Sequence, residues 1–134
     1  MSTSGQMAMY SAVTSLPSQI ESCASILDAA DRRAVFAELR QLRLQRVVCC
    51  GMGGSAFPMD LLRVWLRGQV SVEVHRDYPV GLAKVEPDTL YLLLSFSGNT
   101  EEVLACADAL YNQNARLCAV TNGGMLAQWS KTHG

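Results

Sequence analysis

From residue 46 onward, the chain alternates short apolar runs with stretches in which apolar residues recur every three or four positions. The short runs are typical of strands and span residues 47–50, 70–75, 89–94 and 115–120. The stretches with the longer period predict helices over residues 55–67, 100–111 and 125–131. Strands that alternate with helices pair in parallel through right-handed crossovers. The pattern therefore predicts an α/β fold built on a doubly wound parallel sheet.

The first two of these helices carry apolar stripes that we expect to be buried. After the first strand, the stripe consists of Leu61, Leu62, Trp65 and Leu66. In the next helix it consists of Val103, Leu104, Ala107 and Leu110. Ser55 is expected to cap the first helix and Gly68 to end it. Asn99 and Glu102 have the spacing of a capping box at the start of the second helix.

The first 45 residues predict a different organisation. We interpret residues 1–14 as a flexible lead-in and residues 15–45 as two helices that pack on the domain 46–134. The first helix has Pro17 at its first position and apolar residues at helical spacing, namely Leu16, Ile20, Cys23, Leu27 and Ala30. The second is expected to be capped by Asp31, and its apolar stripe consists of Val35, Leu39 and Leu42.

Length and composition exclude several classes of protein for this chain. A chain of 134 residues is long enough for one domain with its own core and too short for two ordinary ones. A net charge of -1 without a basic cluster argues against a nucleic-acid partner or an anionic membrane surface. The sequence has neither an apolar stretch of membrane-spanning length nor the pattern of a signal peptide. The five cysteines form an odd set without C-x-x-C spacing, which indicates small core residues in a reducing, cytoplasmic compartment.

Polar loops follow the first and third predicted strands. They are Gly51-Met52-Gly53-Gly54-Ser55 and Ser95-Phe96-Ser97-Gly98-Asn99-Thr100. In an open α/β sheet, ligands bind beyond the carboxyl ends of the strands, where the strand order reverses. With the flavodoxin-like order 2-1-3-4, both loops would face one crevice together with two helix N-termini and their unpaired N–H groups. Four neutral hydroxyl groups without a lysine or a metal-binding pair are suited to a phosphate monoester.

Two other interpretations of these loops remain open. The serines and threonine can act only as helix caps and the glycines only as turn formers, with no ligand bound. Gly51-Met52-Gly53 followed by Ala56 also satisfies the dinucleotide fingerprint of a Rossmann domain, and Glu73 or Asp77 lies at about the right distance to hold a ribose. That second alternative assigns no role to residues 95–100. A nucleotide triphosphate is disfavoured because the Gly-Lys-Ser/Thr of a P-loop is absent.

The charged residues near the loops are expected to be structural. Glu101 and Glu102 complement the dipole in the first turn of their helix. Arg76 and Asp77 are expected to form a surface pair, and His75 to end a strand. His75 and His133 are too few and too far apart for a zinc site.

The motif Gly51-Met52-Gly53-Gly54-Ser55-Ala56 is one of several that occur together in one known family. The others are Arg76-Asp77-Tyr78, Ser95-x-Ser97-Gly98-Asn99-Thr100-Glu101-Glu102 and Gly123-Gly124. With Leu16-Pro17-Ser18-Gln19-Ile20 near the start, they resemble the bifunctional phosphoglucose/phosphomannose isomerase family, which belongs to the sugar isomerase (SIS) superfamily. The similarity extends from about residue 15 to residue 127, and the Ser-x-Ser-Gly-Asn-Thr loop is its most specific part.

The resemblance implies a five-stranded parallel sheet whose last strand this chain lacks, and the interconversion of glucose 6-phosphate or mannose 6-phosphate with fructose 6-phosphate. By this similarity, Gly53, Gly54 and Ser55 would line the sugar side of the pocket, and Ser95, Ser97 and Thr100 would hold the phosphate. No metal or organic cofactor is implied. The family's catalytic base, ring-opening histidine and catalytic arginine lie beyond the matching stretch.

We therefore expect an incomplete isomerase domain, with no catalytic residue in this chain, that works with a second SIS domain or a homodimer partner. An uncovered apolar edge strand in a four-stranded sheet also predicts a partner outside the chain. The alternative is a non-catalytic SIS domain that senses a sugar phosphate and regulates a partner. A sensor is expected to carry an attached DNA-binding or catalytic module.

Overall fold

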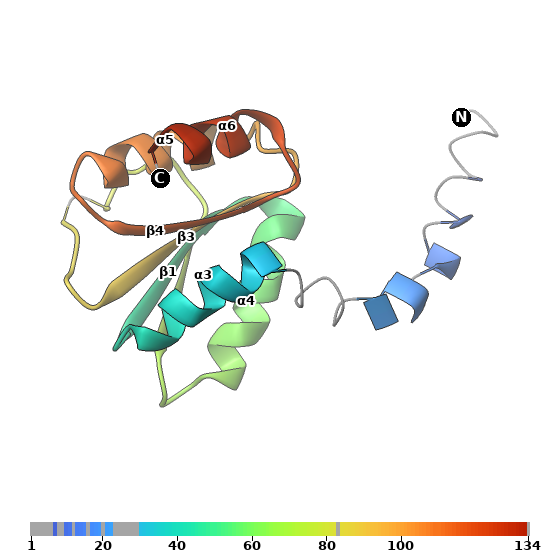
Figure 1. Ribbon diagram of the computed structural model, residues 1–134, viewed down its shortest axis with the longest axis horizontal. Coiled ribbons are helices and arrows are strands. Elements are labelled where there is room, and N and C mark those ends of the chain that lie inside the picture. Colours follow the sequence, from blue (N-terminus) through green and yellow to red (C-terminus); the bar gives the residue numbers. More distant parts are fainter. Residues whose placement is uncertain are drawn as a thin grey trace. The chain divides into compact units, whose positions relative to one another are not determined.

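The computed structural model describes residues 30–82 and 84–133, and, closer to the N-terminus, residues 7, 10, 11, 13–15, 17–19, 21 and 22. The chain divides into two compact units, residues 1–42 and residues 43–134. The first unit contains the helix α3, Ala30–Gln41. The second contains a four-stranded sheet and three further helices (Figure 1).

In the first unit, the helical positions extend further towards the N-terminus than the sequence predicts. Met7, Tyr10 and Ser11 are helical within the expected lead-in, and the Thr14 hydroxyl donates to the Tyr10 carbonyl oxygen at 3.0 Å. α3 begins at Ala30, so Asp31 lies inside its first turn and does not cap it. The predicted stripe residues Leu16, Ile20, Cys23 and Leu27 lie outside the described residues. Packing of the N-terminal helices on the second unit stays a prediction.

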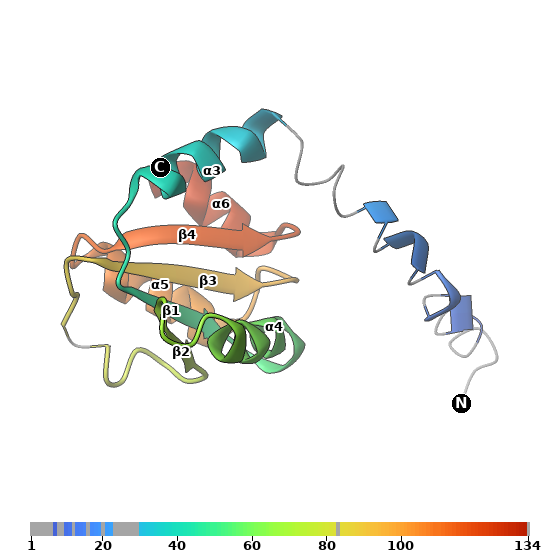
Figure 2. The same cartoon turned by 90° about the horizontal axis from the view of Figure 1, so that it is seen from below.

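The sheet of the second unit has the predicted topology. Its strands are β1 (Arg46–Gly51), β2 (Ser71–His75), β3 (Thr89–Ser95) and β4 (Arg116–Thr121). They lie in the order β2-β1-β3-β4, and every neighbouring pair is parallel (Figure 2). The order 2-1-3-4 therefore confirms the doubly wound, flavodoxin-like arrangement, whose strand order reverses between β1 and β3.

Helices cover both faces of this sheet. α4 (Gly53–Trp65) lies on one face, and α5 (Glu101–Tyr111) and α6 (Gly124–His133) lie on the other (Figure 1). The main core forms on the α5 and α6 face, where alternate residues of β1 and β3 meet the apolar sides of both helices. Its fully buried members include Cys50, Leu93, Val103, Cys106, Ala107, Leu110 and Leu126. The predicted stripe of α5 is thus confirmed, with Leu104 packed at its margin.

α4 differs from its prediction in both its start and its buried face. It begins at Gly53 with Met52 as the N-cap residue, so Ser55 is its third residue and not its cap. Leu61 and Trp65 are 59% and 78% exposed, whereas Leu62 is half-buried and Ala56 is fully buried. Successive helical residues are about 100° apart around the axis, so only one side of the predicted stripe can face the sheet.

The cysteines are core residues, as predicted. Cys49, Cys50 and Cys106 are buried free thiols, and Cys118 is half-buried. Burial raises the pKa of Cys49 to about 12, and a hydrogen bond with Cys106, together with burial, raises the pKa of Cys50. Cys23 lies outside the described residues. None of the helices in the described part of the chain is both long enough and apolar enough to cross a membrane.

Candidate functional site

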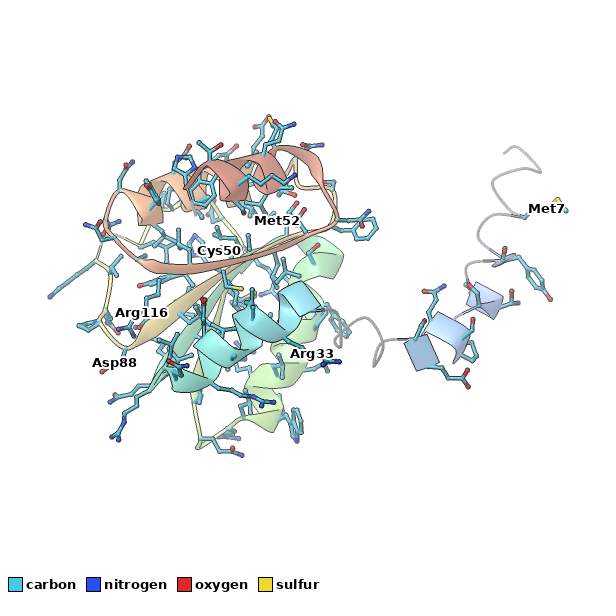
Figure 3. The ribbon with its side chains drawn as sticks, viewed as in Figure 1. Met7, Arg33, Cys50, Met52, Asp88 and Arg116 are labelled. Atoms are coloured by element: carbon cyan, nitrogen blue, oxygen red, sulfur yellow. The ribbon has the colours of Figure 1, made fainter. Side chains whose placement is uncertain are left out.

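The two predicted loops begin at adjacent strand ends. Gly51, the last residue of β1, pairs with Leu94 of β3. A Cβ atom on Gly51 would lie 3.2 Å from both the Cβ and the carbonyl oxygen of Leu94, so glycine allows the strands to approach closely here. Figure 3 shows Cys50 and Met52 near this end of the sheet, with Asp88 and Arg116 towards the opposite end. Both candidate loops therefore lie at the carboxyl edge of the sheet, where the strand order predicts a ligand site.

The loop after β3 contains a pair of hydroxyl groups in contact. Ser95 Oγ and Thr100 Oγ1 are 2.8 Å apart, and the Gly98 N–H donates to Ser95 Oγ at 3.0 Å. Ser95 is only 2% exposed. Thr100 is the N-cap residue of α5, yet its side chain makes no capping hydrogen bond. Its hydroxyl is directed towards Ser95 and leaves the N–H groups of the first turn without an intrahelical partner.

Ser55 connects the two loops. Its Oγ accepts a hydrogen bond of 3.4 Å from the Phe96 N–H, so a residue in the first turn of α4 contacts the loop after β3. Ser97 is exposed, and its Oγ accepts from the Asn99 N–H at 3.2 Å. Gly53 and Gly54 are also exposed, and a Cβ atom on either would meet nothing within 4 Å. The structure thus joins Ser95 to Thr100 by a hydrogen bond, joins Ser55 to the backbone of the same loop, and leaves open space at the Cβ positions of Gly53 and Gly54.

The turn between β4 and α6, to which the sequence analysis gave no role in the site, contacts the loop after β3. The Gly98 carbonyl oxygen accepts from the Leu126 N–H at 2.8 Å, and Asn99 Oδ1 accepts from the Met125 N–H at 3.0 Å. Asn99 therefore contacts the start of α6, and the predicted capping box with Glu102 is wrong. A Cβ atom on Gly98 would lie 1.8 Å from the Gly123 carbonyl oxygen, and one on Gly124 would lie 2.2 Å from the Ser97 carbonyl oxygen. The only sequence signal for this contact is the Gly123-Gly124 pair.

A cavity of about 420 Å³ opens beside Ser55 and Ser95, whereas the other candidate residues, Gly53, Gly54, Ser97 and Thr100, do not line it. Ser55 and Ser95 contribute to its polar side, and its apolar wall is formed by Pro58, Met59, Leu94, Phe96 and Val120. Lysine and arginine are absent from both loops. These two loops themselves offer an anion hydroxyl groups, backbone N–H groups and the positive ends of α4 and α5.

Two of the acidic residues near the loops, Asp77 and Glu101, have hydrogen-bond partners of their own. Both glutamates lie in the first turn of α5, as predicted, and Glu101 accepts a hydrogen bond from the Tyr78 hydroxyl at 3.3 Å. The nearby Glu101 charge raises the pKa of Tyr78. Asp77 Oδ1 accepts from the Tyr78 N–H at 2.7 Å. Asp77 therefore stabilises the turn in which it lies.

The remaining charged candidates are paired away from the loops. Arg76 forms an ion pair with Asp60 of α4, so the predicted pair with Asp77 is wrong. Glu73 and Glu86 both pair with Arg46, the first residue of β1, at the amino end of the sheet. Glu73 is thus directed away from the Gly51 turn, where the dinucleotide alternative needs a carboxylate for the ribose. His75 ends β2, as predicted.

Comparison with solved structures identifies the class of the fold. The Vibrio vulnificus NanR protein complexed with ManNAc-6P superposes with a TM-score of 0.69 at 19% identity, covering 87% of this chain and 47% of that one. The sugar isomerase domain of an RpiR transcription factor from Sphaerobacter thermophilus gives a TM-score of 0.63 at 21% identity, covering 83% and 68%. The fold of this chain is that of a sugar isomerase (SIS) domain.

Comparison with curated sequences identifies its relatives. The chain is a homologue of the bifunctional phosphoglucose/phosphomannose isomerases, which confirms the resemblance seen in its motifs. It is 33% identical over 128 residues to the enzyme of that name from Caldicellulosiruptor bescii, covering 94% of this chain and 36% of the relative. The chain thus spans about a third of the length of that relative. No protein-family model matches the sequence.

Proposed function

We propose that this chain is the sugar-phosphate-binding domain of an aldose–ketose isomerase that interconverts glucose 6-phosphate or mannose 6-phosphate with fructose 6-phosphate. The observation that carries the proposal is the contact of the Ser95 and Thr100 hydroxyls at the N-terminus of α5, beside Ser55 at the N-terminus of α4. The homologous isomerases support the substrate class. The SIS fold of the two solved structures supports a site at this sheet edge.

In this proposal, the phosphate lies over the loop after β3. Thr100 and Ser95 exchange their mutual hydrogen bond for bonds to phosphate oxygens, and Ser97 contributes its exposed hydroxyl. The free N–H groups of the first turn of α5 complete the anion site. The sugar extends towards Gly53, Gly54 and Ser55, where the absence of Cβ atoms on the glycines leaves room for it.

The proton transfer needs groups outside these loops. In an aldose–ketose isomerisation the ring opens, a base removes the proton from C2, and the resulting enediolate is protonated at C1. The double bond then re-forms as the C2 carbonyl, while a positive group stabilises the oxyanion. The loop residues named above include neither a carboxylate placed as a base nor a cation. We therefore assign the base, the ring-opening histidine and the catalytic arginine to a second SIS domain, because a second copy of this stretch would bring only the same loop residues.

A second candidate function is a non-catalytic sugar-phosphate sensor. It is favoured by the structural similarity to the sugar isomerase domain of a transcription factor. Isomerase turnover by the protein together with its partner domain separates the two candidates, because a sensor binds the sugar phosphate without converting it. We also propose a cytoplasmic location, since the four described cysteines are free thiols.

The test is a thermal-shift titration of the purified chain with fructose 6-phosphate, inorganic phosphate and NAD. We expect fructose 6-phosphate to raise the melting temperature, because a ligand that binds only the folded state stabilises it. The variants Ser97→Ala and Thr100→Ala should lose that response. Thr132→Ala, at an exposed position near the end of α6, is the control and should keep it. Stabilisation by NAD alone would contradict the proposal.

A further inference from the structure

A second hollow lies at the amino end of the sheet, opposite to the two candidate loops. It has a volume of about 460 Å³ and is formed by the last turn of α4, the turn that follows it and the start of β2. Its polar side chains are those of Arg63, Arg67, Gln69 and Ser71, which are all exposed residues. None of the described residues that line the hollow is acidic. The hollow is therefore positively charged, and it lies in a part of the chain that the proposed function does not use.

Arg63 and Arg67, the arginine pair, have no acidic partner of their own. Within the described part of the chain neither of them forms an ion pair, whereas Arg46 and Arg76 both do. Asp60 lies one helical turn before Arg63 and is the only acidic residue of α4, but it is paired with Arg76. The carboxylate that helical spacing places within reach of Arg63 is thus already occupied.

The positive charge of the arginine pair exceeds the negative charge at the end of the helix dipole. The C-terminus of a helix is equivalent to about half a negative charge. Each guanidinium group of the arginine pair carries a full positive charge, and like charges four residues apart repel each other. A bound anion would cancel the excess charge and remove this repulsion, so it would stabilise this end of α4.

We propose that this hollow binds the phosphate group of a small molecule through the arginine pair, with the Ser71 hydroxyl and the Gln69 amide as further donors. The proposal goes beyond the function proposed above and does not depend on it. A carboxylate has two oxygens, and one guanidinium group can bind both. A terminal phosphate presents three acceptor oxygens, so two guanidinium groups and a hydroxyl group can bind it together. A volume of about 460 Å³ also leaves room for the rest of a small molecule.

The hollow is separate from the proposed sugar-phosphate site. Ser55 lies in the first turn of α4 and Arg63 in its last turn. At a rise of about 1.5 Å per residue, these positions are about 12 Å apart along the helix axis. One phosphate group cannot contact both, so substitutions at either site should leave binding at the other intact.

The first experiment measures the binding of pyrophosphate to the 134-residue chain by calorimetry at constant ionic strength. All samples carry Thr100→Ala, which removes the anion site proposed at α5. Adding Arg63→Gln and Arg67→Gln together should raise the dissociation constant of pyrophosphate at least about tenfold, because charge-assisted hydrogen bonds are lost. The control adds Arg116→Gln and Lys131→Gln, which remove two exposed positive charges outside the hollow, and should leave the dissociation constant unchanged.

The outcomes of this experiment are distinct from those that test the proposed function. Equal weakening by the two double substitutions would overturn the proposal, because it would assign the binding to overall charge. Unchanged binding after Arg63→Gln and Arg67→Gln would also overturn it and would leave the arginine pair only a role at the helix end. With Thr100 intact, the same two substitutions should leave the thermal response to fructose 6-phosphate unchanged, and loss of that response would assign the pair to the stability of the fold.

A second measurement locates the bound anion without any substitution. Pyrophosphate added to the ¹⁵N-labelled wild type should shift the backbone amide resonances of Gly68, Gln69 and Ser71, which line the hollow. The absence of shifts at these residues would overturn the proposal, whether or not the loop after β3 responds. Acetate at the same ionic strength should shift them much less, because one guanidinium group satisfies a carboxylate. Equal shifts with acetate would overturn the assignment of the hollow to a phosphate group.

Discussion

The hydroxyl groups of Ser95 and Thr100 lie 2.8 Å apart, although Thr100 occupies the N-cap position of α5 and could have bonded to its own helix. A side-chain cap typically contributes about 1 kcal/mol to a helix. The Thr100 hydroxyl makes no such capping hydrogen bond. The buried Ser95 Oγ accepts a hydrogen bond from the Gly98 N–H. The first turn of α5 therefore has no side-chain cap from Thr100, and its N–H groups stay available for an anion in the proposed site.

Removing one hydroxyl of this pair should abolish ligand binding without unfolding the protein. Thr100→Val keeps the shape of the side chain and removes only its hydrogen-bonding capacity. At a ligand concentration 100 times its dissociation constant, the wild type should gain about 2.7 kcal/mol of stability, and the variant should gain much less. The measurement is the free energy of chemical unfolding with and without fructose 6-phosphate. A full ligand effect in Thr100→Val would move the anion site away from α5.

Gly98→Ala should destabilise the protein far more than a glycine substitution at an open position. Its Cβ would lie 1.8 Å from the Gly123 carbonyl oxygen, and its φ of 69° is one that alanine rarely adopts. Gly68 has a similar positive φ of 85°, but a Cβ atom there would meet nothing within 4 Å, so Gly68→Ala serves as the matched control. We expect a loss of about 1–2 kcal/mol at Gly68 from backbone strain alone, and a clearly larger loss at Gly98.

Equal losses of unfolding free energy at the two glycines would show that the turn between β4 and α6 moves at little cost to make room for a Cβ atom at Gly98. The unfolding free energies in urea decide between these outcomes. The same samples also report on binding, since a displaced loop after β3 should weaken the response to fructose 6-phosphate.

Asn99 should act as a positioning residue for the phosphate loop. Its Oδ1 accepts the Met125 N–H at 3.0 Å, which ties the loop to the first turn of α6. Asn99→Ala should cost about 1 kcal/mol of stability and weaken the binding of fructose 6-phosphate, whereas Asn99→Asp keeps an acceptor oxygen and should restore much of both. Binding constants from calorimetry test this. If Asn99→Ala binds fructose 6-phosphate as tightly as the wild type, the hydrogen bond between Asn99 and Met125 has no influence on the binding site.

Alkaline pH should destabilise the fold through its buried thiols. Burial raises the pKa of Cys49 from 9.0 to about 12, so the unfolded chain loses this proton at a lower pH than the folded protein. The contribution of Cys49 to stability is therefore complete below pH 9 and is lost as the pH rises from about 9 to 12. Cys49→Ala should flatten the decline of the unfolding free energy between pH 9 and about 12. An unchanged slope would assign the decline to other groups.

The sequence by itself determined the sheet and the position of the two candidate loops. Apolar runs separated by helical patterns specify parallel strands, because each strand must be buried on both faces by its crossover helices. The glycine and serine loops follow β1 and β3 in the sequence, and the order 2-1-3-4 makes those strands neighbours. The contact between Ser95 and Thr100 is predictable from the sequence, because the two residues belong to one short loop.

Only the tertiary structure decided which side of α4 is buried, which residues bond across the loops and which charges pair. The periodicity of α4 marks apolar residues around much of the helix, but the contact with β1 and β2 selects the face of Ala56 and leaves Trp65 exposed. The Asn99 side chain bonds to Met125, and Arg76 bonds to Asp60, although the sequence favoured nearer partners for both. Local patterns limit which bonds a residue can make. Its partner depends on which segments the folded backbone brings within hydrogen-bond distance.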